Sequence, residues 1–400
     1  MCIAALLVAM IMSSLDNTIV STALRSIILE LHQQELAPWI GSAYMITSAS
    51  TAALYGRFAD TFGRKSVFIF ALIVFEIGSL ICGMASSMEM LILGRAIAGV
   101  GGGGLNSLVL IIISDIVSIR NRGKFQSIVG AAIGISSICG PLAGGAFSDH
   151  WSWRWCFYVN IPFGVFTVLI IALIRFNVVE GNVKDKLRRI DYIGSFTLLA
   201  SVTSFVTPLV SGGTIWAWNS APVLVLFPFS AVFFAAFVYN EIKIAKDPIV
   251  PAAMFVNSNV AALLGIALSL GCIFFSSSYY ISLFFQIVFN NTATEGGVAS
   301  IPMIMGMVIT TLVSGVLVSK TGKYRLYFFM GPAILAVGVG LTSLLNGRSG
   351  MAERIIFLAL MGFGAGFVFQ MRVVALQASV PTKYIAVVTA LASTCLLLGG

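Results

Sequence analysis

Residues 90–113 read MLILGRAIAGVGGGGLNSLVLIII, and Arg95 is the single charged side chain in this stretch. A helix that crosses the hydrocarbon core of a bilayer needs about 20 consecutive, mainly apolar residues. The stretch is long enough to meet this requirement, and glycine in its centre lets neighbouring helices pack closely. It therefore predicts a membrane-spanning helix.

The same pattern recurs along the whole chain of 400 residues, of which 58% are hydrophobic and 10% charged, against roughly 25% charged in soluble domains. Thirteen apolar runs predict spans at residues 2–27, 38–55, 67–86, 90–113, 126–147, 156–174, 192–211, 221–239, 259–283, 297–318, 327–345, 354–371 and 385–400. We expect an all-α polytopic membrane protein whose partner is the lipid bilayer. This composition excludes a cytosolic enzyme, a nucleic-acid-binding protein and a secreted protein.

The basic residues between the spans predict the orientation of the chain. With a cytoplasmic N-terminus, the inner loops hold 18 of the 23 Lys and Arg residues, Arg372 among them, and the outer loops hold three. Cytoplasmic loops carry an excess of Lys and Arg, so this split favours a cytoplasmic N-terminus. The sequon that begins at Asn290 falls on an outer loop and is a candidate glycosylation site, with chance occurrence as the alternative.

Two predicted inner loops resemble each other. Residues 56–65 read GRFADTFGRK and residues 315–324 read GVLVSKTGKY. Eight helices separate them, and an even number predicts a parallel repeat, as in transporters built from two like halves. Alternatively, any tight turn selects glycine and basic residues.

The repeat predicts three regions. These are an N-terminal six-helix half at 1–176, a basic loop with two inserted helices at 177–250, and an incomplete C-terminal half at 251–400. A complete second half would need a fourteenth helix, so we expect the final helix to be missing from this chain.

Three charged residues stand out inside predicted spans: Asp16 in the first, Glu76 in the third and Arg95 in the fourth. Charges at such positions are costly and usually functional. A carboxylate in a low-dielectric environment can take up and release protons near neutral pH, and a neighbouring arginine opposes that uptake. The three residues are therefore candidates for proton coupling; a static pair that fixes helix packing is the alternative.

Small and polar residues in the spans suggest a moving, hollow bundle. In the fifth span they predict a close-packed, bent helix that acts as a pivot, with ordinary helix crossing as the alternative: Gly130, Gly134, Gly140, Pro141, Gly144 and Gly145. Aromatic and amide residues are candidates to line a substrate cavity, although lipid contact or packing would explain each one singly: Asn17, Tyr44, Tyr279, Gln286 and Gln370. Because His32 and His150 are the only histidines, we expect no metal site, no cofactor and no catalytic residues.

Five segments, in order along the chain, resemble one family. Residues 15–24, LDNTIVSTAL, are similar to the first-helix signature of the fourteen-helix drug:proton antiporters of the major facilitator superfamily. Residues 56–65 resemble the loop motif of the superfamily, residues 93–99 its fourth-helix motif, and residues 130–145 the antiporter motif of the fifth helix. Residues 151–162 resemble a signature of fungal members, which include toxin efflux pumps.

The resemblance assigns the loop motif a role in conformational change, through Gly56, Asp60, Gly63, Arg64 and Lys65; Thr61 replaces its usual basic residue. It implies a major facilitator fold of two six-helix halves with two extra helices between them. Arg95 matches the arginine to which this family assigns proton coupling.

The implied function is a proton-coupled antiporter, not an enzyme, that exports small amphipathic organic molecules such as drugs or secondary-metabolite toxins by alternating access. The implied partners are protons and a small-molecule substrate. We expect a monomer in the plasma membrane, with the vacuolar membrane as the alternative. Uptake or vacuolar transport of basic amino acids or siderophores stays open, as does a non-transporting sensor or truncated form.

Overall fold

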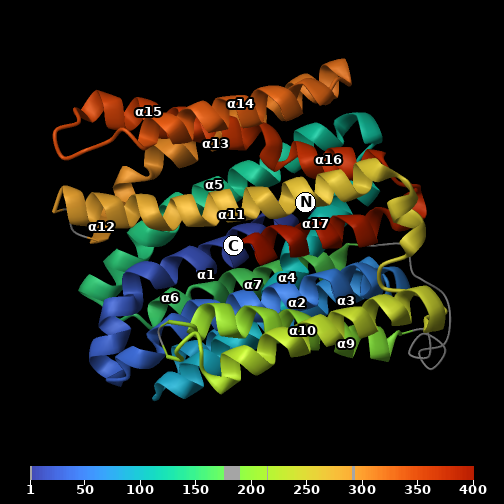
Figure 1. Ribbon diagram of the computed structural model, residues 1–400, viewed down its shortest axis with the longest axis horizontal. Helices are drawn as coiled ribbons and strands as arrows, with labels where there is room; N and C mark the ends of the chain where they lie inside the picture. The colour runs from blue at the N-terminus through green and yellow to red at the C-terminus, as the bar shows by residue number, and fades with distance from the viewer. Residues whose placement is uncertain (1, 175–189, 214, 291–292) are drawn as a thin grey trace.

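The computed structural model describes residues 2–174, 190–213, 215–290 and 293–400, and most of these residues are helical (Figure 1). No β-strand occurs within these ranges. The basic segment 184–189 and the sequon residues Asn291 and Thr292 lie outside the described residues.

Each of the thirteen predicted spans coincides with a helix or a pair of consecutive helices. The first seven helices are α1 (Cys2–Leu31), α2 (Ala37–Phe62), α3 (Arg64–Gly83), α4 (Met88–Ile116), α5 (Ile119–His150), α6 (Trp155–Tyr158) and α7 (Asn160–Leu173). Two more follow, α9 (Tyr192–Ser211) and α10 (Ala221–Tyr239). The remaining helices are α11 (Ser258–Val288), α12 (Ala293–Ala299), α13 (Ile301–Thr321), α14 (Arg325–Thr342), α15 (Met351–Phe369), α16 (Met371–Ala378) and α17 (Ile385–Gly399).

Twelve helical segments of the described residues are long and apolar enough to cross a membrane. Helix α2 is the exception among the predicted spans. Its 26 residues suffice in length, but serine and threonine recur along it at Ser42, Thr47, Ser48 and Ser50 and lower its hydropathy.

The predicted loop at 56–65 is wrong in extent, because residues 56–62 continue α2 and only Gly63 separates α2 from α3. Gly63 has φ +91°, and Gly322, its equivalent in the second predicted copy, has φ +71° at the end of α13. Glycine adopts positive φ at little cost, so each copy turns on it.

The sequence also misplaced the end of the twelfth span. The predicted end at residue 371 is wrong, since the helical segment breaks at Gln370 and then continues as α16 to Ala378. Arg372 was assigned to an inner loop, but it lies in this membrane-spanning segment and is 3% exposed. The apolar run ends before the helix does, and this caused the error.

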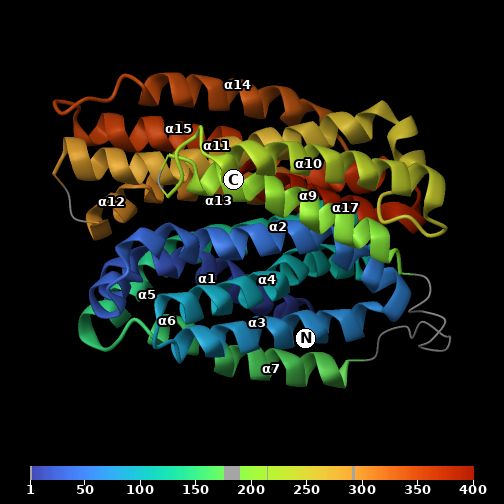
Figure 2. The same cartoon turned by 60° about the horizontal axis from the view of Figure 1, so that its bottom comes forward.

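The helices run roughly along one direction, and the late helices α13–α15 lie at one edge of the bundle (Figure 1). Helices α9 and α10 pair with each other, and α9 packs on α2; Figure 2 shows α3 and α7 on the face opposite α14. Between the two predicted halves, α5 packs on α13 and α17 packs on α2. One helix of each predicted half, α5 or α17, thus packs on a helix of the other half.

Equivalent glycines sit at these two crossings. A Cβ on Gly56 of α2 would lie 2.8 Å from the Ala386 carbonyl oxygen of α17. One on Gly315 of α13 would lie 1.9 Å from the Ser127 hydroxyl of α5. Only glycine permits this approach at either site, and this correspondence supports the predicted repeat.

Candidate functional site

A buried ion pair joins α1 and α4. The Nη1 of Arg95 donates to Asp16 Oδ2 at 2.5 Å, and both side chains are at most 1% exposed. Asn160 of α7 donates its Nδ2 to the other carboxylate oxygen at 3.2 Å, and Arg95 Nε donates to the Ile40 carbonyl at 3.1 Å. The structure thus brings together two of the three predicted proton-coupling residues, with opposite charges compensating each other.

Tyr44 of α2 connects this pair to a cavity. Its ring centroid lies 4.4 Å from the guanidinium carbon of Arg95, a cation–π contact. Its hydroxyl lies 3.1 Å from that of Ser13 in a hydrogen bond. Tyr44 and Ser13 line the cavity, whereas Asp16 and Arg95 do not. One aromatic ring therefore lies between the ion pair and the open space.

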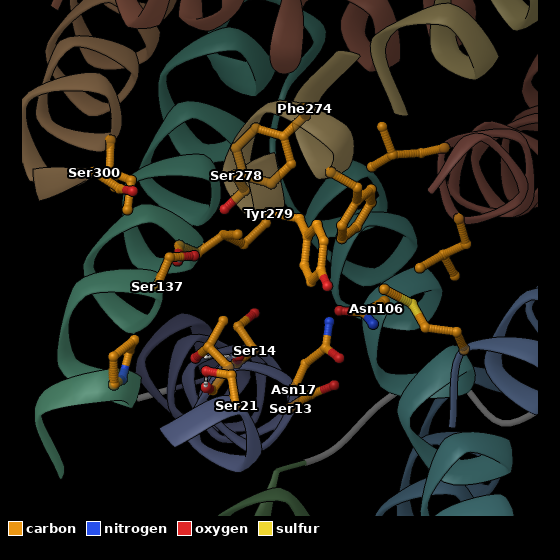
Figure 3. Close-up of a pocket in the computed structure, with 18 of the residues that line it drawn as sticks. Ser13, Ser14, Asn17, Ser21, Asn106, Ser137, Phe274, Ser278, Tyr279 and Ser300 are labelled. Atoms are coloured by element: carbon orange, nitrogen blue, oxygen red, sulfur yellow. Dashed lines mark hydrogen bonds between the residues drawn. The ribbon is translucent and has the colours of Figure 1, made fainter. Parts of the chain in front are cut away.

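The cavity has a volume of about 540 Å³, within the usual range for small-molecule sites. All five residues predicted to line a substrate cavity are on its wall: Asn17, Tyr44, Tyr279, Gln286 and Gln370. Figure 3 shows Tyr279 pointing from α11 toward Asn17 of α1 and Asn106 of α4. Helices from both predicted halves thus contribute to one chamber.

A row of polar side chains on α1 forms much of the wall. Of these residues, only Asn17 was predicted to line a cavity. Its members follow the helical i, i+4, i+8 spacing, which could have revealed the face: Ser13, Ser14, Asn17, Thr18, Ser21 and Thr22. Asn106, Ser278 and Arg372 were missed as well. Asp16 and Asn17 are chain neighbours but point to different sides of α1, because successive helical residues are about 100° apart.

Glu76 does not join the ion pair. Its two carboxyl oxygens are buried and have no hydrogen-bond partner in the described part of the chain. A Cβ on Gly164 of α7 would lie 1.9 Å from Glu76 Oε1, so the carboxyl group lies between α3 and α7. Of the three residues predicted for proton coupling, Asp16 and Arg95 therefore form a pair, and Glu76 lies apart from it.

The motif at the end of α2 ties several helix ends together. Arg64 forms salt bridges to Asp60 at 2.6 Å and to Asp115, at the end of α4, at 2.9 Å. At the end of α7, Lys65 donates its Nζ to the carbonyl oxygens of Ala172 at 2.6 Å and of Ile174 at 2.8 Å. Asp115 is a partner that the sequence motif did not include.

The glycines of α5 face two different neighbours. Gly130 packs against Gln370 and Thr311, and Gly134 packs against Val308, all from the late helices. Gly140 and Gly144 face α1 through Thr18, Thr22 and Ile19. Pro141 follows Gly140 directly, inside the helix and on the cavity wall.

Polar contacts, two of them between the predicted halves, lie at the end of the bundle that carries Gly56 and Gly315. Lys124 N of α5 donates to Ser319 Oγ of α13 at 2.9 Å. Gln126 Nε2 donates to Gln377 Oε1 at 2.8 Å, and Gln377 Nε2 donates to Thr389 Oγ1 at 2.9 Å. The bonds of Lys124 and Gln126 thus tie α5 to the late helices at this end of the bundle.

The described residues contain no group of three or more His, Cys, Asp or Glu side chains that could hold a metal ion. The groups present at the site are one buried ion pair, the guanidinium of Arg372, hydroxyl and amide groups, and aromatic rings.

Residues 6–400 match the sequence profile of the Major Facilitator Superfamily. The chain is 34% identical over 405 residues to the MFS-type efflux pump MFS1 of Trichophyton rubrum, an alignment that covers 100% of this chain and 75% of that protein. It is 36% identical over 393 residues to the efflux pump aunC of Aspergillus niger, covering 97% and 74%. A solved structure of the proton:xylose symporter XylE, bound to 6-bromo-6-deoxy-D-glucose, superposes with a TM-score of 0.68 at 13% identity, covering 100% and 86%.

Proposed function

The chain belongs to the Major Facilitator Superfamily of transporters, and we propose that it is a proton-coupled antiporter that exports small amphipathic organic molecules by alternating access. The observation that carries this proposal is the buried Asp16–Arg95 pair directly behind the cavity wall. The efflux pumps among its fungal relatives support export as the direction.

In this proposal Asp16 is the proton acceptor. A proton on Asp16 removes the negative charge that holds Arg95 Nη1, and leaves the guanidinium bound to the Ile40 carbonyl and the Tyr44 ring. Tyr44 lines the cavity, so a change at the ion pair reaches the cargo through one side chain. Cargo that displaces Tyr44 would, reciprocally, shift proton binding at Asp16.

Helix α5 is the proposed pivot. Its two glycine surfaces let the late helices and α1 slide past it, and Pro141 permits the helix to bend next to Gly140. The close crossings at Gly56 and Gly315 would open when the chamber opens toward their end of the bundle. We assign that end and the N-terminus to the cytoplasm of a plasma-membrane protein, and the halves to residues 1–176 and 251–400.

The cavity itself argues against basic amino acids as cargo. None of its described lining residues is Asp or Glu, so a strongly cationic molecule would find no counter-charge. Glu76 enters the proposal as a second carboxyl group whose part in coupling is tested apart from that of Asp16.

The test is transport after a pH jump. Purified chain in vesicles is supplied with a panel of fluorescent amphipathic drugs, and their accumulation is followed with and without a proton gradient. We expect gradient-driven accumulation in the wild-type chain and none with Asp16→Asn. Glu76→Gln makes the same change in a carboxyl group without touching Arg95, and it tests the part of Glu76 in coupling separately.

Unchanged pH-dependent transport in Asp16→Asn would remove Asp16 from the mechanism. A chain that inserts correctly but moves no member of the panel under any gradient would favour the non-transporting sensor instead.

A further inference from the structure

The cavity has one charged wall position. Among its described lining residues, Arg372 alone carries a charged side chain. It stands at the start of α16, directly after the helix break at Gln370. With 3% exposure, this guanidinium is a positive charge kept away from bulk water.

Arg372 lacks the compensation that Arg95 has. Its Nη1 donates to the Phe369 carbonyl oxygen at the end of α15, and the Phe369 ring centroid lies 5.0 Å from the guanidinium carbon. Its buried Nε has no acceptor within the described residues, and no Asp or Glu among them forms a salt bridge with it. A buried charge without a counter-charge is costly, and an anion would relieve that cost.

The surroundings define the kind of anion. Phe274, Phe275 and Phe369 give the cavity wall near the late helices aromatic surface, and Tyr279 adds an amphipathic ring. The opposite wall is the polar face of α1, with hydroxyl and amide groups such as Ser14 and Asn17 (Figure 3). A flat apolar body with one acidic group at its end would match all three features.

We infer that Arg372 is the residue that selects the cargo, and that the preferred cargo is an aromatic or otherwise planar organic acid whose carboxylate or phenolate binds this guanidinium. Arginine suits this role because its planar donors can hold a carboxylate with two parallel hydrogen bonds. The inference rests on the proposed function, since it assumes that the cavity is the cargo site.

A purely structural role for Arg372 is the alternative, because a cation at the end of a helix stabilises its last carbonyl groups. Arg354 provides a matched control. It donates to the Ser349 carbonyl from Nε and Nη2 at 2.9 and 2.7 Å and lies 3.6 Å from the Phe289 ring centroid. Both arginines thus combine a carbonyl bond with an aromatic ring, but Arg354 is not on the cavity wall.

The experiment compares three fluorescent probes with the same aromatic body: 1-pyrenebutyrate, its methyl ester and 1-pyrenebutylamine. Binding to the whole chain in lipid nanodiscs is followed by energy transfer from tryptophan, with empty nanodiscs as the blank. We expect the acid to bind at least about tenfold more tightly than the ester or the amine, since hydrogen bonds to a charged group contribute that much.

Arg372→Gln should abolish the preference for the acid and leave ester affinity unchanged, and Arg372→Lys should retain part of it. Arg354→Gln should leave the preference intact. Equal affinity of the wild-type chain for acid and ester would overturn the inference, as would a preference that survives Arg372→Gln or disappears equally in Arg354→Gln. Equal affinities of the wild-type chain overturn the inference even if a variant does not fold.

The two proposals fail differently. If no pyrene probe binds, the inference about Arg372 is lost, and the transport assay with Asp16→Asn still decides the proposed function. If proton-driven transport is present but acid and ester bind equally, only the inference about Arg372 is lost.

Discussion

Arg95 and Arg372 are both buried in the membrane-spanning bundle, yet their surroundings differ in one decisive respect. Arg95 has a carboxylate, a carbonyl oxygen and an aromatic ring as partners, and it lies behind the cavity wall. Arg372 has a carbonyl oxygen and an aromatic ring but no carboxylate partner among the residues that the structure describes, and it lies on the wall. The protein neutralises one cation internally and leaves the other for a partner that enters the cavity.

This difference teaches how a buried charge can be interpreted. An ion pair closed within the protein can change only when a proton or a movement breaks it, which suits coupling. A lone buried cation changes when a ligand arrives, which suits recognition. If Arg95 serves coupling and Arg372 serves recognition, substitutions at the two positions should have different effects.

The largest expected effect is on stability, and it separates the two arginines. Arg95→Met leaves Asp16 buried without its counter-charge, which should lower the free energy of unfolding by about 3–5 kcal/mol. Arg372→Met removes one carbonyl hydrogen bond but also an uncompensated charge, so its effect should stay within about 1 kcal/mol. Unfolding in mixed detergent micelles measures both, and equal losses would show that Arg372 has an internal partner after all.

A double variant sharpens the same point. Asp16→Leu together with Arg95→Met removes the pair as a unit, and replacement of buried ion pairs by apolar residues is often neutral. We expect the double variant to recover most of the roughly 3–5 kcal/mol lost in Arg95→Met, while gradient-driven transport stays absent. Recovery of transport along with stability would mean that the pair only fixes helix packing.

A smaller effect is expected at the crossing of α5 and α13. Gly315→Ala adds a Cβ where the Ser127 hydroxyl already lies, and overpacking of this kind costs about 1–3 kcal/mol. Because this contact holds α5 and α13 together, its loosening should increase the labelling, from that end, of a cysteine introduced on the cavity wall. Gly340→Ala is the control, since a Cβ there meets no atom within 4 Å.

The smallest change is Tyr44→Phe, which keeps the ring under Arg95 and removes the hydrogen bond with Ser13. We expect a stability loss of about 1 kcal/mol, weaker cargo binding and preserved proton coupling. If coupling is lost instead, the Tyr44 hydroxyl rather than its ring connects the cavity to the ion pair.

Much of this arrangement could be predicted from the sequence. Asp16 and Arg95 stood out because an isolated charge in an apolar run must find a partner, and they are each other's partner. The five cavity residues stood out for the same reason, as amides and phenols in helices that otherwise avoid them.

Other features depended on geometry that a single chain does not encode locally. Glu76 could not be assigned, because its spacing does not say whether α3 turns it toward α1 or toward α7. The bond from Asn160 to Asp16 joins residues far apart in the chain. Arg372 was mistaken for a loop residue because the positive-inside pattern counts basic residues without measuring how far a helix continues.

The most direct test of the account is proton movement driven by cargo. Vesicles that contain the chain and a pH-sensitive dye inside are given a gradient of a transported drug, and the internal pH is recorded for the wild-type chain, Arg372→Gln and Asp16→Asn. With a neutral drug as cargo, we predict a pH change both in the wild-type chain and in Arg372→Gln. We predict no pH change in Asp16→Asn. A pH change of wild-type size in Asp16→Asn would contradict it.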